Sequence, residues 1–288
     1  MSKIRKCVIP VAGIGTRFLP ATKAQPKEML PVVDKPVVQY VVEEAVAAGI
    51  TDIILVTGPS KRAVEDHFSP NYELVGWLKK QGKNKLVAEV KRIADLANFI
   101  FIRQKGPYGN GTPVWCAKDI VGNEPFAVLW GDEFFYSPHK PRLKQLLEVY
   151  QKYQSPVVTA YQVQDDDTNR YGILKTTPLG RGVHKVKDII EKPGPLKAPS
   201  RLAILGGYIL TPDIFSALAR TKVGKDGELW LVDAIKKLLP RQTVYAREVT
   251  GKYFDTGSKL GWLKANLELA QVHPELKQPF KDYLKGLK

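Results

Sequence analysis

The sequence of 288 residues contains few of the side chains from which disulfide frameworks and structural metal sites are built. Its two cysteines, Cys7 and Cys116, lie far apart, which excludes a disulfide framework, a Cys-x-x-Cys redox pair and a thiolate zinc site. The four histidines show no i, i+4 pairing and stand at His67, His139, His184 and His273. We therefore expect any bound metal to be a hard cation held by carboxylates, and we expect a reducing compartment.

Long hydrophobic runs are absent as well. No stretch of 18 or more apolar residues occurs, and the first apolar segment, which follows Lys6, is soon interrupted by Pro10 and Gly13. We therefore expect a soluble, cytoplasmic protein without a membrane-spanning segment.

Acidic residues are scarce relative to basic ones. The chain has 29 Asp and Glu against 44 Lys and Arg, a formal net charge of +15. Such an excess favours anionic partners, which are nucleic acid, an anionic membrane surface or phosphorylated small molecules. The densest basic block runs from Lys79 to Lys85 and continues to Arg92. Because no aromatic residues are interleaved in it for base stacking, the block favours a solvated helix face over a nucleic-acid site.

Short apolar runs alternate with helix-like stretches over about the first 160 residues. This alternation is typical of parallel strands joined by crossover helices. Strands are expected over residues 7–11, 52–57, 99–102, 126–130 and 156–161. Helices are expected over residues 37–48, 113–119 and 141–153.

The pattern changes beyond Asp165 to extended segments rich in glycine and proline. Residues 171–174 and 203–210 are expected to add antiparallel strands to the sheet, and residues 193–199 to form a surface loop. Two helices, over 260–271 and 279–287, are expected to close the chain. We predict an α/β fold with a mixed, mainly parallel central sheet flanked by helices, and a single domain over 1–288.

A glycine-rich loop follows the first expected strand and reads Gly13-Ile14-Gly15-Thr16-Arg17. Glycines at such a position let backbone N–H groups approach a phosphate chain, because no Cβ intervenes. The loop is not a dinucleotide fingerprint, since its third glycine position is Phe18, and no Gly-Lys-Ser/Thr of a Walker A loop follows. The sequence therefore predicts a phosphate site of another kind.

This loop, together with Pro26-Lys27, resembles the signature of the sugar-phosphate nucleotidylyltransferases. The segments 19–23 and 26–36 are similar to the bacterial uridylyltransferases that use UTP and glucose 1-phosphate. The likeness continues through 190–193 and 255–261, so it covers nearly the whole chain. It implies a Rossmann-like, GT-A-type fold, a nucleotide-binding half over about 1–160, and a sugar-binding and C-terminal helical part over about 161–288.

The implied reaction is attack of a sugar 1-phosphate on the α-phosphorus of a nucleoside triphosphate, which depends on cations and a metal rather than on a covalent nucleophile. The resemblance places three catalytic cations at Arg17, Lys27 and Lys192. Asp132 and Asp255 each follow an apolar run, and open α/β sheets bind ligands at the carboxyl ends of strands. In the family these two aspartates hold Mg²⁺, which suits a site of few carboxylates and substrate oxygens.

The resemblance also implies the residues that bind each substrate. On the nucleotide side these are Ala12, Gly13, Gly15, Thr16, Gln104 and Gly109. A glutamine amide carries both a donor and an acceptor and so complements the imide edge of uracil. On the sugar side the implied residues are Gly172, Glu191 and Gly207.

Departures from the family pattern keep other substrates open. Thr112-Pro113 stands where the uridylyltransferases commonly have His-Ala, and Trp130-Gly131 stands where they commonly have Leu-Pro. Thymidylyl transfer, or uridylyl transfer to another hexose phosphate, is the first alternative, and a non-catalytic basic nucleic-acid-binding or regulatory protein is the second. A homo-oligomer, dimer or tetramer, is implied by the resemblance, and the aromatic content of the C-terminal helices leaves room for an interface.

Overall fold

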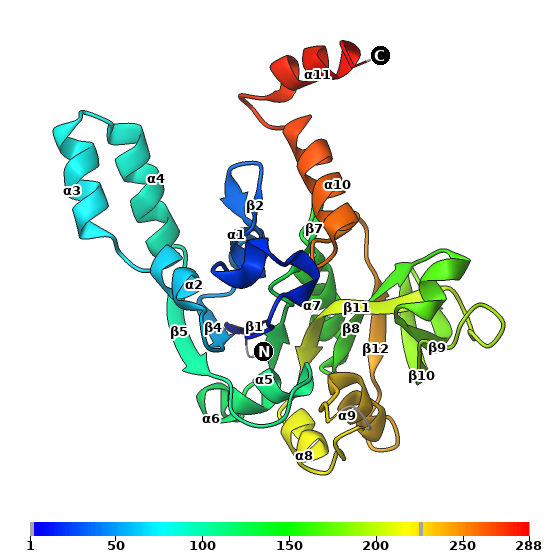
Figure 1. Ribbon diagram of the computed structural model, residues 1–288. Helices are drawn as coiled ribbons and strands as arrows, with labels where there is room; N and C mark the ends of the chain where they lie inside the picture. Colours follow the sequence, from blue (N-terminus) through cyan, green and yellow to red (C-terminus); the bar gives the residue numbers. More distant parts are fainter. Residues whose placement is uncertain (1–2, 225–226, 288) are drawn as a thin grey trace.

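The computed structural model describes residues 3–224 and 227–287, and across these residues a nine-stranded sheet forms the centre of the molecule (Figure 1). Its strand order is β5-β4-β1-β6-β11-β8-β12-β10-β9. The strands are β1 (Lys6–Val11), β4 (Asp52–Thr57), β5 (Asn98–Arg103), β6 (Phe126–Val128), β8 (Val157–Gln162), β9 (Gly172–Gly180), β10 (Val183–Glu191), β11 (Leu202–Leu210) and β12 (Tyr245–Glu248).

The direction of the strands differs between the two halves of this sheet. β5, β4, β1 and β6 pair in parallel, as the alternation of apolar and helical segments predicts. From β6 onward the pairing is antiparallel except where β12 lies beside β8. The expected antiparallel additions are therefore present, and the description "mainly parallel" fits the N-terminal half only.

Helices cover both faces of the sheet. Along the chain they are α1 (Val37–Ala47), α2 (Arg62–His67), α3 (Tyr72–Lys80), α4 (Asn84–Ala94), α5 (Gly111–Cys116), α6 (Lys118–Val121), α7 (Arg142–Tyr153), α8 (Asp213–Ala219), α9 (Leu231–Leu238), α10 (Lys259–Ala270) and α11 (Lys277–Lys285). The helix expected over 113–119 is divided into α5 and α6, and residues 193–199 lie in a loop as expected. The other predicted helices are present within two residues of their expected bounds.

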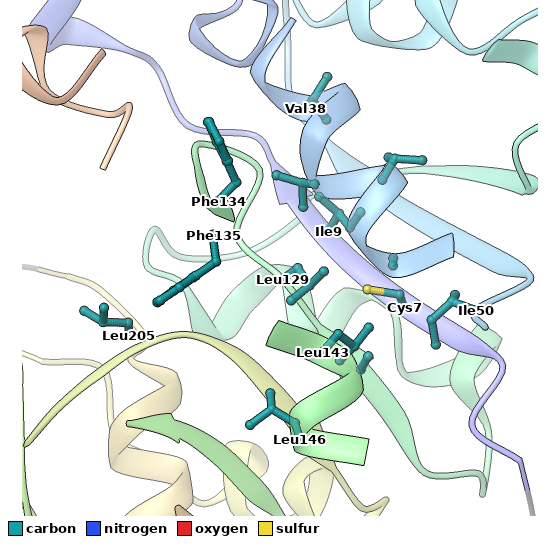
Figure 2. Close-up of a cluster of buried hydrophobic side chains, with 14 of the residues drawn as sticks. Cys7, Ile9, Val38, Ile50, Leu129, Phe134, Phe135, Leu143, Leu146 and Leu205 are labelled. Atoms are coloured by element: carbon teal, nitrogen blue, oxygen red, sulfur yellow. The ribbon is translucent and has the colours of Figure 1, made fainter. Parts of the chain in front are cut away.

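Two hydrophobic cores lie on opposite faces of the sheet. Side chains alternate along β1, so Cys7 and Ile9 pack in the core with α1 and α7, whereas Val8 packs in the core with α5, α8 and α9. Figure 2 shows the first core, which includes Leu143 and Leu146 of α7 together with Leu129. Burial on both faces holds β1 firmly, and the glycine loop begins where this strand ends.

A small second sheet carries the expected metal ligands. β7 (Glu133–Tyr136) and β13 (Lys252–Asp255) pair antiparallel, with Asp255 opposite Glu133. Asp132 directly precedes β7, so this pairing brings two aspartates that are far apart in sequence to one place. A short hairpin of β2 (Pro31–Val32) and β3 (Lys35–Pro36) precedes α1.

Two helical segments extend away from the body of the molecule. The hairpin of α3 and α4 projects on one side, and α11 lies at the end of the arm that α10 begins (Figure 1). The basic side chains from Lys79 to Arg92 are exposed on this hairpin, as expected for a solvated face. No helix among the described residues is both long and apolar enough to cross a bilayer.

Candidate active site

The glycine loop after β1 is shaped around Lys27. Gly15 has a positive φ of 77°, which an L side chain rarely adopts, and its carbonyl accepts a hydrogen bond of 2.7 Å from the Thr22 hydroxyl. A side chain at Gly13 would lie 3.3 Å from the Lys27 ammonium. The glycine at position 13 therefore leaves the space through which Lys27 approaches the loop.

One cavity of about 530 Å³, here called the loop cavity, lies against this segment. Nine of the residues expected from the sequence line it, namely Ala12, Gly13, Gly15, Thr16, Arg17, Lys27, Gln104, Gly109 and Asp132. They come from the carboxyl ends of β1, β5 and β6 and from the turn at Lys27–Met29, so the fold brings together the residues that the motif analysis selected.

Lys27 and Asp132 form a close ion pair at the wall of the loop cavity. Burial disfavours the charge of Lys27, but Asp132 and Glu28 outweigh it and raise the pKa of the ammonium. Burial likewise disfavours the charge of Asp132, but Lys27 and Arg17 hold the pKa of that carboxyl below its usual value. Both groups are therefore charged at neutral pH and face the same space.

Asp132 and Asp255 converge on Gly257. A side chain at Gly257 would lie 3.0 Å from the Asp132 Oδ2 atom and 3.2 Å from the Asp255 Oδ1 atom, with Arg17 close by. Asp255 also accepts a hydrogen bond of 2.9 Å from Arg170. Burial and the negative charge of Asp132 raise the pKa of Asp255. Two carboxylates that repel each other in a partly buried site are stabilised by a shared cation.

This pair fits a magnesium ion that takes most of its ligands from substrates. Within the described residues no cluster of three or more His, Cys, Asp or Glu side chains could hold a metal. Mg²⁺ in phosphoryl-transfer sites commonly uses one or two carboxylates together with phosphate oxygens and water. Asp132 and Asp255 are the residues that would hold it.

A second, smaller cavity of about 140 Å³ adjoins the loop cavity and is here called the aromatic cavity. Asn110 and Trp130 line both cavities. Gly172 and Glu191, the expected sugar-side residues, line the aromatic cavity, and Lys192 follows Glu191 at the end of β10. The Lys192 ammonium lies 3.9 Å from the Glu191 carboxylate and 5.9 Å from the ring centroid of Trp230.

The glycine that faces the aromatic cavity is Gly206 rather than Gly207. Gly206 lines the cavity, and a side chain there would overlap Trp130 and Glu133. Gly207 has a φ of 112°, and a side chain there would meet the Thr159 hydroxyl at 2.6 Å and the buried Arg142. β11 has an irregular register between Ile204 and Tyr208 that changes which residue points to each side, and the sugar-side role expected of Gly207 stays a prediction.

A buried charge network that sequence reasoning missed supports the same region. The Arg142 guanidinium has no solvent exposure and bonds the Glu44 carboxylate at 3.0 Å through two nitrogens. It also lies 3.3 Å from Glu133, which accepts a 2.7 Å hydrogen bond from the Tyr253 hydroxyl. Burial raises the pKa of Glu133 to about 7 against the opposing effect of Arg142. In the sequence, the only indication that Glu133 belongs to this region is its position directly after Asp132.

Comparison with known proteins identifies the family. The family model for nucleotidyl transferases matches residues 6–272. The chain is 49% identical over 287 residues to a UTP–glucose-1-phosphate uridylyltransferase of Bacillus subtilis, covering 100% of this chain and 98% of that protein. It is 47% identical over 287 residues to a UTP–glucose-1-phosphate uridylyltransferase of Staphylococcus epidermidis, covering 100% and 99%.

Solved structures agree with this assignment. The UDP-glucose pyrophosphorylase from Acinetobacter baumannii superposes with a TM-score of 0.93 at 40% identity, covering 99% of this chain and 100% of that one. A UDP-glucose pyrophosphorylase complexed with UDP-glucose superposes with a TM-score of 0.86 at 40% identity, covering 94% and 100%. From the family match, these relatives and the site geometry it follows that the chain belongs to the nucleotidyl transferase family.

Proposed function

We propose that this protein transfers a uridylyl group from UTP to α-D-glucose 1-phosphate, giving UDP-glucose and pyrophosphate. The observation that carries the proposal is the junction of the two cavities, where Lys27 and Asp132 of the loop cavity lie next to the aromatic cavity with Glu191. An enzyme that joins a triphosphate to a sugar phosphate requires two adjoining sites of this kind.

In the reaction, an oxygen of the sugar phosphate forms a bond to the α-phosphorus of UTP. The bond from that phosphorus to the oxygen bridging to the β-phosphate breaks, and pyrophosphate leaves with the electron pair. Arg17 and Lys27 bind the triphosphate oxygens and stabilise the negative charge that develops on the leaving group. Lys192 binds the sugar phosphate and reduces its repulsion from the triphosphate.

Magnesium, held by Asp132 and Asp255, would neutralise phosphate charge and bring the two substrates into line. Lys27 forms an ion pair with Asp132, and Arg170 forms one with Asp255, so protein cations lie beside both carboxylates.

The nucleotide and the sugar are recognised by different halves of the chain. Gln104 and Gly109, together with Ala12, hold the uracil side of the loop cavity, and Gln104 offers the donor and acceptor that the imide edge requires. Glu191 accepts hydrogen bonds from sugar hydroxyls, and Gly172 leaves room for them. The chain acts as a single domain, with nucleotide binding in about 1–160 and sugar binding in about 161–288.

We further propose a cytoplasmic homo-oligomer, a dimer or tetramer. The two cysteines are both free, which suits a reducing compartment. α11 has no buried residue and α10 exposes Leu260, Leu263 and Leu267, so this arm has apolar surface available for contact with another subunit.

The test is a panel of nucleoside triphosphates against hexose 1-phosphates with pyrophosphate release as the readout. UTP with glucose 1-phosphate should be among the pairs with the highest kcat/KM. A clear preference for thymidine triphosphate, or for another hexose phosphate with UTP, would keep the chemistry and replace the substrates. Salt-sensitive retention of RNA or DNA without any turnover would overturn the proposal in favour of a binding protein.

A further inference from the structure

The aromatic cavity has an unusual lining for a site that binds a hydroxyl-rich ligand. Four aromatic side chains line it, namely Trp130, Tyr171, Tyr208 and Trp230. Ile204, Leu205 and Val232 add apolar surface. Aromatic rings present flat apolar faces, and the C–H faces of a pyranose ring pack against such surfaces while its hydroxyls bond to polar groups at the edge.

Trp130 is placed at the junction of the two cavities. It follows β6 by two residues, and its ring meets the Tyr208 ring edge to face at a centroid separation of 5.4 Å. The indole occupies the volume that a side chain at Gly206 would require. Trp130 and Gly206 therefore form a matched pair, in which the missing side chain of one residue admits the large ring of the other.

Trp230 stands at the start of α9 and is tied to the loop cavity. The backbone N–H of the next residue, Leu231, donates a 2.8 Å hydrogen bond to the side chain of Asn110, which lines both cavities. The Lys192 ammonium lies 5.9 Å from the centroid of the Trp230 ring. A phosphate held by Lys192 therefore brings its attached sugar close to this indole.

We propose that Trp130 and Trp230 are specificity-determining residues that bind the C–H surface of the hexose and limit its size. The inference rests on the proposed function and adds to it the substrate class, which is hexose 1-phosphates whose ring carries hydroxyl groups without an N-acetyl substituent. Trp130 fills space beside Gly206, so a bulky ring substituent lacks room on that side. Glu191 supplies the polar contact that orients the hydroxyls.

The experiment compares wild-type enzyme with Trp130→Leu, Trp230→Leu and the control Trp77→Leu. Trp77 is exposed on α3 and lines neither of the two cavities. Either cavity variant should raise the KM for glucose 1-phosphate about 10-fold, while the KM for UTP stays within about twofold. Trp130→Leu should also raise the kcat/KM for N-acetylglucosamine 1-phosphate relative to glucose 1-phosphate about fivefold. Trp77→Leu should match the wild type in all of these quantities.

Two further variants distinguish loss of the aromatic contact from loss of folding. Trp130→Phe and Trp230→Phe keep an aromatic face and should recover most of the affinity for UDP-glucose measured by calorimetry, whereas the leucine variants should not. If wild-type enzyme turns over UTP with glucose 1-phosphate but both leucine variants keep the wild-type KM and the wild-type sugar preference, the inference is wrong and the proposed function stands. If the wild-type enzyme releases no pyrophosphate from UTP with any of the hexose 1-phosphates, the proposed function itself fails.

Discussion

Lys61 donates a hydrogen bond of 2.7 Å to the carboxylate of Glu28, and the two side chains are only 5% and 1% exposed. Glu28 belongs to the short turn that carries Lys27, and Lys61 stands at the start of α2. Burial raises the pKa of Glu28, and Lys61 acts against that shift. This buried pair connects two segments, the turn that carries Lys27 and the loop after β4. It therefore restrains the backbone position of Lys27.

Replacing Lys61 by methionine should destabilise the protein and disturb catalysis together. The substitution keeps much of the volume but leaves the Glu28 carboxylate buried without its cation, which costs about 3–5 kcal/mol. Urea denaturation measures this loss. The control is Lys35→Met, since Lys35 pairs with a partly exposed Glu43 that keeps Gln39 and Arg92 as partners, and it should cost about 0–1 kcal/mol. Equal free energies of unfolding for the two variants would contradict the conclusion that Lys61 compensates the buried charge of Glu28.

Asp132→Asn should change the dependence of the reaction on Mg²⁺. Losing one of two carboxylates lowers the affinity for a hard cation, so the Mg²⁺ concentration for half-maximal activity should rise about 10-fold. A Mg²⁺ titration of pyrophosphate release is the measurement. Asp119→Asn, on the exposed side of α6, removes the same charge elsewhere and should leave the titration unchanged. An identical Mg²⁺ curve for Asp132→Asn and wild type would mean that Asp132 is not a ligand.

Lys192→Ala should lower kcat/KM by about 100-fold, because one preorganised charge contact in the transition state is worth about 3 kcal/mol. The side chain is half exposed, so folding should be retained. Lys192 has a φ of 45°, in the left-handed region, and a control must share that backbone. Arg181, with a φ of 53° in a turn outside both cavities, provides it. Arg181→Ala should keep full activity, and near-wild-type turnover of Lys192→Ala would remove this residue from the site.

His67 should make stability depend on pH below neutrality. Burial lowers its pKa from the ordinary value of 6.5, although Glu43 opposes the shift, and its Nε2 lies 2.9 Å from the Gln39 side-chain oxygen. The unfolded chain therefore binds a proton at a higher pH than the folded chain does. The stability that neutral His67 contributes is complete above pH 6.5 and is lost as pH falls below it.

The measurement is calorimetry of wild type and His67→Gln at pH 7.5 and 5.5. The variant cannot gain a proton at this position, so the Tm of the wild type should fall by about 2–4 °C more than that of His67→Gln. Parallel changes in the two proteins would show that another group controls stability in this range.

Much of the fold and most of the loop cavity follow from the sequence alone. The parallel strands β1, β4, β5 and β6 are continuous apolar runs, and such runs are typical of parallel strands; β1, β4 and β6 are largely buried, whereas β5 at the edge of the sheet is only half-buried. Asp132 and Lys27 could be selected because a strand end and a glycine motif mark their places, and the structure brings them into an ion pair. The pairing of β7 with β13, which carries Asp255 to Asp132, had no local signal.

Two features of the structure could not be predicted from the sequence, and each has a physical reason. The sequence has no local signal for the register irregularity of β11 between Ile204 and Tyr208, which turns Gly206 toward the aromatic cavity. The bounds of α3 and α4 were not predicted either, since the sequence indicated only a solvated helix face in the basic block from Lys79 to Arg92. Their apolar residues Tyr72, Trp77 and Leu86 are exposed, so apolar periodicity there does not report a buried face.

The most direct test of the proposed reaction is phosphorus NMR of a mixture of the protein, UTP, glucose 1-phosphate and Mg²⁺. We expect the resonances of UTP and glucose 1-phosphate to decline together while those of UDP-glucose and pyrophosphate appear in equal amounts. Release of inorganic phosphate without UDP-glucose, or persistence of both substrates under conditions where the protein is folded, would contradict it.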